Sequence, residues 1–554
     1  MFLNFLPGWP LPIVAIALPL LAAFILGCSI LLRNAYEVHR PESFEFKRIY
    51  LKFPFLFFLF LNFVLSSIVW SYARDAGVTF FMLGGTGWTE AQSAVGSGIF
   101  QMLVLLDPLG AISAFLTSFI VLVAGLRSLA DKADPITPNK AFFFLLTLGG
   151  VLGIFYAGGV TNLLFFLLLS QAGATGLYQS DNKEGLLLSL RNSYWYVLSR
   201  VLLIMLFAAG VLLLAVTYKV SGFGQLRTLM EPGTLVAVAY VLLSAPLFFL
   251  FIKSSSHSAD SSKRCYFAMR SYAAFFALLR VNFLLFGRVQ GFERIPWLYI
   301  LLGGTALLAA FLLALTDRDP VRFTESVELF MKGFITVSLG LSLSGTSSAL
   351  SAAEYGLGAL ESMLSLWMLF LPISAALSII GAFLKQQYAG RELWSIGGLA
   401  HTLPFTGAVF FIVICGLAGL PPFPGFVSRQ FLYRSANALN PFLTLFLFAM
   451  SLAILFMGIR YIAEVLFGKS PEGEEKIDGD KQIALPLFLI LIFLFCTSAM
   501  PGRYYEDAVS KSVGSLMQAS TAGAGELSGM QDRVGENEDE QDIPDVEPIP
   551  EVSE

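Results

Sequence analysis

The chain has 554 residues, of which 56% are hydrophobic and only 13% are charged, and its mean hydropathy is +0.73. An ordinary soluble domain has about 25% charged residues, so the composition excludes a water-soluble globular protein. The formal net charge of −4 is unevenly distributed. Residues 501–554 contain 13 acidic and 3 basic residues, a net of −10, which leaves +6 for residues 1–500.

Apolar runs long enough to cross a bilayer recur along the chain and predict an all-α polytopic membrane protein. The first run lacks a small-residue cleavage pattern and is too long for a signal-peptide core, so we expect it to remain as a transmembrane helix. We predict about fourteen spans, at residues 11–32, 50–70, 99–126, 141–157, 160–178, 194–217, 234–252, 266–287, 296–315, 323–344, 356–384, 403–433, 441–467 and 483–500.

Basic residues alternate between the connections. Loops after odd-numbered spans contain 21 Lys and Arg, whereas loops after even-numbered spans contain six. Because basic loops stay on the cytoplasmic side, this bias predicts that both termini lie on the outer side. We expect the membrane to be a prokaryotic cytoplasmic (inner) membrane. We divide the chain into residues 1–98 (spans one and two with an outer loop), 99–470 (the core), 471–500 (a loop and the last span) and 501–554 (an acidic, disordered tail).

Several charged residues fall at membrane depth, where each costs roughly 2.5 to 3.5 kcal/mol on insertion scales. Near the ends of spans such side chains can snorkel to the interface, and Glu328 and Lys332, four residues apart, can neutralise each other. Deep in long spans, a place in an ion pathway or a structural ion pair is the better explanation. The candidates for an ion pathway are Arg200, Arg280, Glu328, Lys332, Glu361 and Arg429, with Asp107 as a further titratable group.

Prolines interrupt the seventh and twelfth spans. Pro246 lies inside the seventh, and Pro421, Pro422, Pro424 and Gly425 lie inside the twelfth. Breaks five spans apart are typical of inverted repeats, here spans four to eight and nine to thirteen. Two ordinary kinked helices are the alternative.

The segments GGLAHTLP (397–404) and GLAGLPPFPGFVSR (416–429) resemble the twelfth-helix signature of a known family. The family is that of the antiporter-like, ion-translocating subunits of respiratory complex I (NADH:quinone oxidoreductase), of membrane-bound hydrogenases and formate hydrogenlyases, and of multi-subunit Na+/H+ antiporters. Weaker matches are Leu278-Leu279-Arg280, Ser199-Arg200-Val201 and the segment 324–328. The resemblance covers roughly residues 100–470 and implies a core of fourteen helices with outward termini.

The resemblance also implies a central chain of charged residues, of which this sequence keeps only a part. The family's helix-five glutamate falls on Gln171, its helix-seven lysine near Pro246 and its helix-eleven lysine near Leu371. The helix-eight lysine becomes Arg280 and the helix-twelve residue becomes Arg429. Since arginine stays charged and glutamine does not titrate, we expect this chain to conduct protons less readily than the family pattern.

Three functions remain open. The chain is either an ion-translocating subunit of a complex I-like or hydrogenase-like redox complex, or a scaffold that transmits coupling without its own pathway, or a membrane subunit of a non-redox Na+/H+ antiport or inorganic-carbon uptake complex. We expect other membrane and peripheral subunits and the lipid bilayer as partners, and no nucleic acid. The four Cys are far apart, with no CxxC or nearby His pair, and no nucleotide motif is present, so we expect no catalytic residues, metal or cofactor on this chain.

Overall fold

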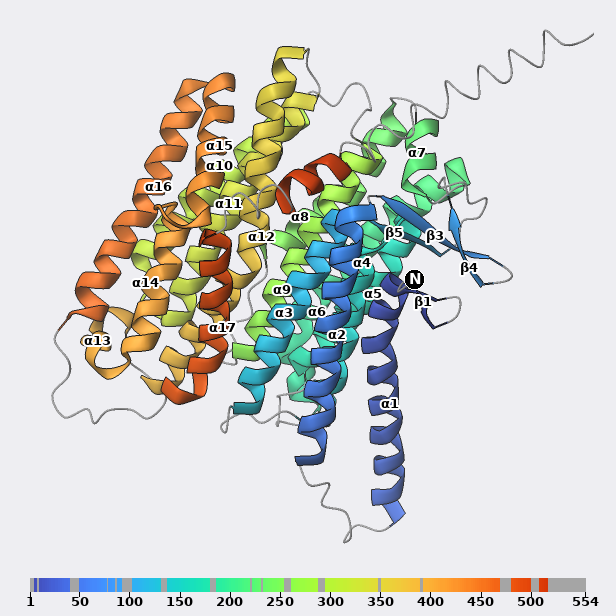
Figure 1. Ribbon diagram of the computed structural model, residues 1–554, viewed down its shortest axis with the longest axis horizontal. Coiled ribbons are helices and arrows are strands. Elements are labelled where there is room, and N and C mark those ends of the chain that lie inside the picture. Colours follow the sequence, from blue (N-terminus) through green and yellow to red (C-terminus); the bar gives the residue numbers. More distant parts are fainter. Residues whose placement is uncertain are drawn as a thin grey trace, which may run out of the picture.

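The computed structural model is a bundle of long, roughly parallel helices, with a small group of strands at one end (Figure 1). Twelve of the described helices are long and apolar enough to cross a membrane, and Pro404–Ala418 and Ile483–Thr497 are shorter apolar helices. The predicted spans thus each find a helix, but the count of fourteen full spans stays a prediction. The structure describes residues 4–6, 9–39, 49–76, 78–84, 87–91, 102–130, 137–179, 186–219, 222–230, 233–253, 261–286, 294–346, 350–388, 392–468, 480–499 and 508–516.

The N-terminal third combines helices with short strands. The hairpin β1 (Asn4–Leu6) and β2 (Trp9–Pro10) is antiparallel, and a second antiparallel sheet has the order β4-β3-β5. Backbone bonds between Leu105 N and Tyr156 O, 2.9 Å, and between Gly158 N and Leu103 O, 2.9 Å, join this sheet to the end of α4. The elements are α1 (Leu11–His39), α2 (Ile49–Ala76), β3 (Thr79–Gly84), β4 (Gly87–Ala91), β5 (Leu103–Leu106) and α3 (Pro108–Ala130).

The remaining chain forms two successive groups of helices. The first is α4 (Pro138–Phe155), α5 (Val160–Gln179), α6 (Leu186–Tyr218), the short α7 (Phe223–Leu229), α8 (Thr234–Ile252) and α9 (Ser261–Leu279) with its π-helical end η1 (Arg280–Leu285). The second is α10 (Ile295–Thr316), α11 (Pro320–Thr346), α12 (Leu350–Gln387), η2 (Leu393–Ser395), α13 (Leu399–Thr402), α14 (Pro404–Ala418), α15 (Pro424–Leu439) and α16 (Pro441–Tyr461) with its π-helical end η3 (Ile462–Leu466). The last named helix is α17 (Asp480–Ala499).

The two groups repeat the same features in the same order. Each begins with a helix pair that approaches closely through glycine: a Cβ on Gly150 of α4 would lie 2.5 Å from the Ser170 backbone nitrogen, and one on Gly303 of α10 would lie 2.7 Å from that of Val337. Such small residues let membrane helices pack backbone to backbone. Each group also ends in a π-helix, η1 or η3. These matched features support the predicted repeats of spans four to eight and nine to thirteen.

One of the two predicted breaks is present. The twelfth span is divided between α14 and α15, with Gly419 at φ +74° and the residues 419–423 between the helices. Pro246, in contrast, lies inside an uninterrupted α8, so the predicted break in the seventh span is wrong. A single proline removes one backbone donor, and the rest of the helix keeps its own hydrogen bonds.

The helices at the centre of the bundle are α9, α11 and α12. All residues in the apolar core of α9 and α12 are buried, whereas α6, α10 and α16 expose large apolar side chains such as Leu202, Leu301 and Phe442. After α17, residues 508–516 form a helical segment in which Val509 and Leu516 are buried. This stretch differs from the disordered tail expected for 501–554; the rest of that tail lies outside the described residues.

Candidate functional site

The carboxyl end of α8 accepts hydrogen bonds from two basic side chains of other helices. Lys332 of α11 donates from Nζ to the carbonyl oxygen of Ile252, 3.3 Å, and Arg200 of α6 donates from Nη2 to that of Lys253, 2.5 Å. The last carbonyls of a helix lack intrahelical partners and form the negative end of the helix dipole. Arg200 and Lys332 therefore stabilise this helix end, and the helix end in turn stabilises both charges.

Glu328 and Lys332 lie one turn apart on α11, and both are buried. The Ser374 hydroxyl of α12 donates a short hydrogen bond to Glu328. The ammonium of Lys332 lies over the rings of Phe251 and Phe370, 5.9 and 5.6 Å from their centroids. This geometry gives the pair one carboxylate, one ammonium and a hydroxyl on adjoining helices, which is the chemistry that a proton relay requires.

Gln171 of α5, where the sequence resemblance predicts the family's helix-five glutamate, accepts a hydrogen bond from Arg270 of α9, 3.2 Å from Nη1 to Oε1. Both side chains are buried. Arg270 was not among the predicted site residues, because it was counted with the basic residues of the loop after the seventh span, although the predicted eighth span (266–287) includes it. Four residues of that count lie buried in helices instead: Arg127, Lys140, Arg264 and Arg270.

The sequence around Arg270 contains a feature that could have placed this residue inside the helix. Arg264 and Arg270 stand six residues apart at the start of a run that continues without Pro or Gly to Arg280. The structure places all three on the single element α9 and η1, with Arg264 donating to Thr324 Oγ1 at 2.8 Å. The eighth span thus begins earlier than hydropathy alone indicated.

Four charged groups gather around Lys332. Glu325, Glu328, Arg200 and Arg270 all lie close enough to interact electrostatically with its ammonium. We call Arg200, Arg270, Glu328 and Lys332, together with Gln171, the Lys332 cluster. It unites three of the predicted pathway residues, Arg200, Glu328 and Lys332, with the predicted degenerate position Gln171.

Arg280 forms a separate site with Asp107. Its Nη2 atom lies 2.5 Å from Asp107 Oδ1, and both side chains are almost completely buried. Asp107 precedes α3 and also accepts from the Gly110 backbone N–H, 3.2 Å, so the carboxylate sits at the positive end of a helix. Gly110 is needed here, because a Cβ on it would lie 2.8 Å from Asp107 Oδ1 and 2.6 Å from the Phe155 carbonyl oxygen.

Arg429 occupies the break between α14 and α15. Its Nη2 donates to the carbonyl oxygen of Leu417 at the end of α14, 2.7 Å, and its Nη1 donates to the Ser451 hydroxyl of α16. The guanidinium lies over the ring of Phe334, 3.6 Å from the centroid. Thus the break predicted from Pro421, Pro422, Pro424 and Gly425 is present, and Arg429 binds the carbonyl that the break releases.

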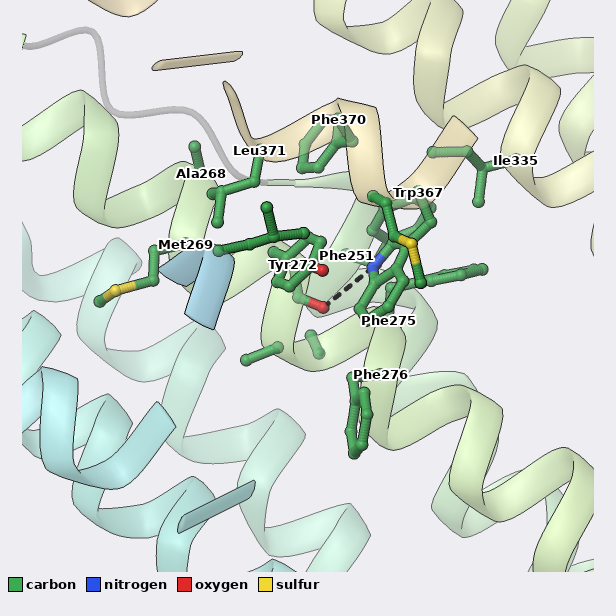
Figure 2. Close-up of a cluster of buried hydrophobic side chains, with 14 of the residues drawn as sticks. Phe251, Ala268, Met269, Tyr272, Phe275, Phe276, Ile335, Trp367, Phe370 and Leu371 are labelled. Carbon is green, nitrogen blue, oxygen red and sulfur yellow. Dashed lines mark hydrogen bonds between the residues drawn. The ribbon is translucent and has the colours of Figure 1, made fainter. Parts of the chain in front are cut away.

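The other predicted positions lie apart from these sites. Glu361 of α12 is half-buried, and no hydrogen bond or ion pair between described residues joins it to Glu328 or Lys332. Leu371, near which the sequence resemblance predicts the family's helix-eleven lysine, is fully buried among aromatic side chains (Figure 2). Within the described part of the chain, no group of three His, Cys, Asp or Glu side chains could hold a metal ion. The expectation of no cofactor stays a prediction.

Comparison with known proteins agrees with this architecture, although no family model matches the chain. A Na+/H+ antiporter subunit of Alkalihalophilus pseudofirmus is 23% identical over 478 residues, which cover 83% of this chain and 88% of that protein. An NADH-quinone oxidoreductase subunit of Desulforamulus reducens is 24% identical over 280 residues, 50% of this chain and 54% of that protein.

Solved structures of the same fold cover nearly the whole chain. A chain of the Mrp complex from Dietzia sp. aligns with a TM-score of 0.71 and 18% identity, over 92% of this chain and 99% of that one. A chain of an archaeal membrane-bound sulfane sulfur reductase aligns with a TM-score of 0.72 and 18% identity, over 93% and 99%. The chain is an integral membrane protein that matches, in sequence and in fold, the family of antiporter-like membrane subunits.

Proposed function

We propose that the chain is an ion-translocating, antiporter-like subunit of a multi-subunit membrane complex, and that it moves H+ or Na+ through buried charges. The observation that supports this function most directly is the Lys332 cluster, in which Lys332 binds the carboxyl end of α8 and Glu328 is buried one turn away on α11. Charged groups inside a membrane are costly, and they typically mark an ion pathway. Other subunits of the complex and the surrounding lipid are the partners.

The residues have different roles in this proposal. Lysine can lose its proton in a desolvated site whereas arginine keeps its charge, so Lys332 and Glu328 exchange the proton. Arg200, Arg280 and Arg429 supply fixed positive charge that sets the electrostatic potential along the pathway. Glu361 and Asp107 remain candidate titratable groups at a distance from this exchange.

The energy source distinguishes two candidate assemblies. In the first, the subunit couples electron transfer on another chain to ion movement, as its likeness to an NADH-quinone oxidoreductase subunit suggests. The second, a non-redox Na+/H+ antiport complex, is favoured by the match to the antiporter protein, which extends over 83% of this chain rather than half. A scaffold without its own pathway is favoured by one specific observation: Gln171, Arg280 and Leu371 stand where the family has titratable residues.

For the location we propose a prokaryotic cytoplasmic membrane with both termini outside. Removing the four buried helix residues from the 21 basic residues of the odd-numbered connections leaves 17 against six. The excess still has the sign that the orientation requires.

The test is ion transport by the complex purified through this chain and reconstituted into liposomes, with the co-purified subunits identified. The double variant Lys332→Met/Glu328→Gln removes both charges and preserves the side-chain volume, and it should abolish driven ion transport by this subunit. Lys385→Met is the matched control, because Lys385 lies on the partly exposed end of α12 in an ion pair with Asp319. Driven transport that is unchanged in the double variant would exclude the ion-translocating role and leave the scaffold.

A further inference from the structure

Six aromatic side chains meet at the centre of the bundle, where α9 packs against both α8 and α12 and where Phe251 of α8 contacts Phe370 of α12. Figure 2 shows them with Leu371 and other apolar neighbours, and each of the six has a relative exposure of 0%. We call these six side chains the aromatic cluster: Phe251 of α8, Tyr272, Phe275 and Phe276 of α9, and Trp367 and Phe370 of α12.

The rings pack continuously. Tyr272 and Trp367 stack with centroids 4.1 Å apart and an angle of 2° between their planes. Phe276 and Phe275 lie 5.9 and 6.2 Å from Trp367, and Phe251 lies 4.7 Å from Phe275. Since stacked and tilted rings at these distances are in contact, no polar group lies between them to form a hydrogen-bonded route.

A buried cation bounds the aromatic cluster at each end. Lys332 lies over Phe251 and Phe370, whereas Arg280 lies over Phe276, 4.8 Å from the ring centroid. Along α9 the three aromatic residues stand between Arg270 and Arg280, which are ten residues and therefore about 15 Å apart along the helix axis. A hydrogen-bonded chain advances about 3 Å at each step. Several linked groups or waters would be needed to cross this distance.

The aromatic cluster offers little for such a chain. The indole Nε1 of Trp367 donates to the backbone carbonyl oxygen of Tyr272, 3.4 Å away, and that bond is drawn in Figure 2. The Tyr272 hydroxyl is the remaining polar side-chain group of the six. Leu371, beside them, has no polar atom, although the family resemblance places a lysine near this position. Buried water requires two to four polar partners, so apolar packing of this kind stays dry.

We propose that the aromatic cluster is a dry seal that divides the charged axis of this subunit into two compartments. One compartment contains the Lys332 cluster, and the other contains the Arg280–Asp107 pair. Protons do not pass between them through the side chains of this conformation. Each compartment acts on the other only through its electric field, unless the aromatic cluster separates and water enters.

The seal deepens the proposed function and rests on it, because it locates the barrier in the pathway that ions are proposed to take. The seal and the proposed function are tested by different experiments, however. The proposed function concerns transport driven by the complex, whereas the seal is tested by passive proton flux with no energy source. A complex that drives no ions would refute the function and still allow the seal to be measured.

The test uses the full-length chain in its reconstituted complex, in liposomes with an internal pH-sensitive dye and a potassium diffusion potential. Wild-type liposomes should show the proton flux of protein-free liposomes. Trp367→His/Leu371→His places two proton-carrying groups in the seal and should raise the flux about tenfold or more, the change expected for even a modest fall in the barrier.

The matched control is Leu369→His. Leu369 is also buried on α12, but it faces a different apolar pocket, which Ile412, Val413 and Gly416 of α14 also line. Its flux should remain at the wild-type level. A wild-type flux well above that of protein-free liposomes would overturn the seal, and so would a folded double variant without any increase.

Tyr272→Phe provides a second measurement that does not depend on the folding of the histidine variants. It removes one hydroxyl from the aromatic cluster and leaves the stacked rings in place. A seal requires that driven transport by the complex continue at the wild-type rate in this variant. Loss of driven transport would identify Tyr272 as a proton carrier through the aromatic cluster and would overturn the proposal.

Discussion

The two buried arginines of the axis, Arg280 and Arg429, are stabilised in different ways. Arg280 pairs with a carboxylate, Asp107, at 2.5 Å. Arg429 binds a released helix carbonyl, a hydroxyl and an aromatic ring, and none of the described carboxylates forms an ion pair with it. The charge of Arg280 is therefore compensated by a carboxylate, whereas Arg429 keeps a positive charge that is stabilised, among the residues that the structure describes, only by a carbonyl, a hydroxyl and a ring.

The same substitution at the two arginines tests this difference most strongly. Arg280→Met leaves Asp107 as a buried carboxylate without its ion-pair partner. Breaking a buried ion pair in this way costs about 3 to 5 kcal/mol. We expect a corresponding loss in the free energy of unfolding of the complex in detergent. Thermal denaturation measures this loss. Arg280→Met/Asp107→Asn should recover a large part of it. A double variant no more stable than the single one would show that Asp107 does not depend on this pair.

Arg429→Met should have a smaller effect. It leaves no unpaired buried charge, but it removes the donor to the Leu417 carbonyl and to the Ser451 hydroxyl. Leaving such buried polar groups without a partner should lower the free energy of unfolding by about 1 to 3 kcal/mol. The same thermal denaturation measures it. A loss as large as that of Arg280→Met would indicate that a carboxylate, or an anion, pairs with Arg429 in the intact complex.

Ser451→Ala separates the parts of the Arg429 site. Ser451 accepts from Arg429, forms a 2.5 Å hydrogen bond with Tyr433, and donates to the Leu447 carbonyl. We expect a loss of about 0.5 to 1.5 kcal/mol, the usual net contribution of a hydrogen bond. Ser428→Ala, a buried serine bonded to the backbone of its own helix, is the control and should cost less. Equal losses would show that Arg429 does not depend on Ser451.

The partly exposed ion pair between Asp319 and Lys385 should make the smallest contribution to the free energy of unfolding, and this contribution should depend on pH. Asp319 and Lys385 lie 2.8 Å apart and are each about one-third exposed. Burial acts against the charge of Asp319, but hydrogen bonds from Lys385 and the Val321 backbone N–H, with the charge of Lys385, lower the pKa of the carboxyl. Its contribution is therefore complete above the unfolded pKa of about 4 and is lost as the pH falls through the folded value.

Asp319→Asn should accordingly lower the free energy of unfolding by less than about 1 kcal/mol near neutral pH, because water screens the partly exposed pair. The thermal midpoint should therefore fall only slightly. The difference from wild type should disappear as the pH falls below the folded pKa. A difference that grows on acidification would mean that the pKa of Asp319 is raised in the folded protein.

The helical fold and the break in the twelfth span could be predicted from the sequence, because apolar length and clustered prolines act locally. The uninterrupted helix at Pro246 could not, since a single proline is tolerated in some helices and breaks others, and the packing around it decides which. Arg270 was misplaced for a related reason: its helix begins at Ser261, in a polar stretch where hydropathy is low. A polar helix end that other helices bury looks like a loop until those helices are known.

The candidate site was predicted only in part. Charge alone identified Arg200, Glu328 and Lys332, and their proximity emerged from α6, α9 and α11 packing around the end of α8. The aromatic cluster had no sequence signal, because phenylalanine is abundant throughout this chain, with 53 residues. What distinguishes these rings is their position between two buried cations, which depends on three helices that are distant in sequence.

The π-helical ends of α9 and α16 show how the two groups of helices correspond. π-Helical turns are rare, yet here one closes each of the two groups. The residues within η1 and η3, RVNFLL and IAEVL, have little in common. The two groups therefore match in backbone geometry at a point where their side chains do not, so the position at which a helix widens relates the two halves of this chain better than the residues found there.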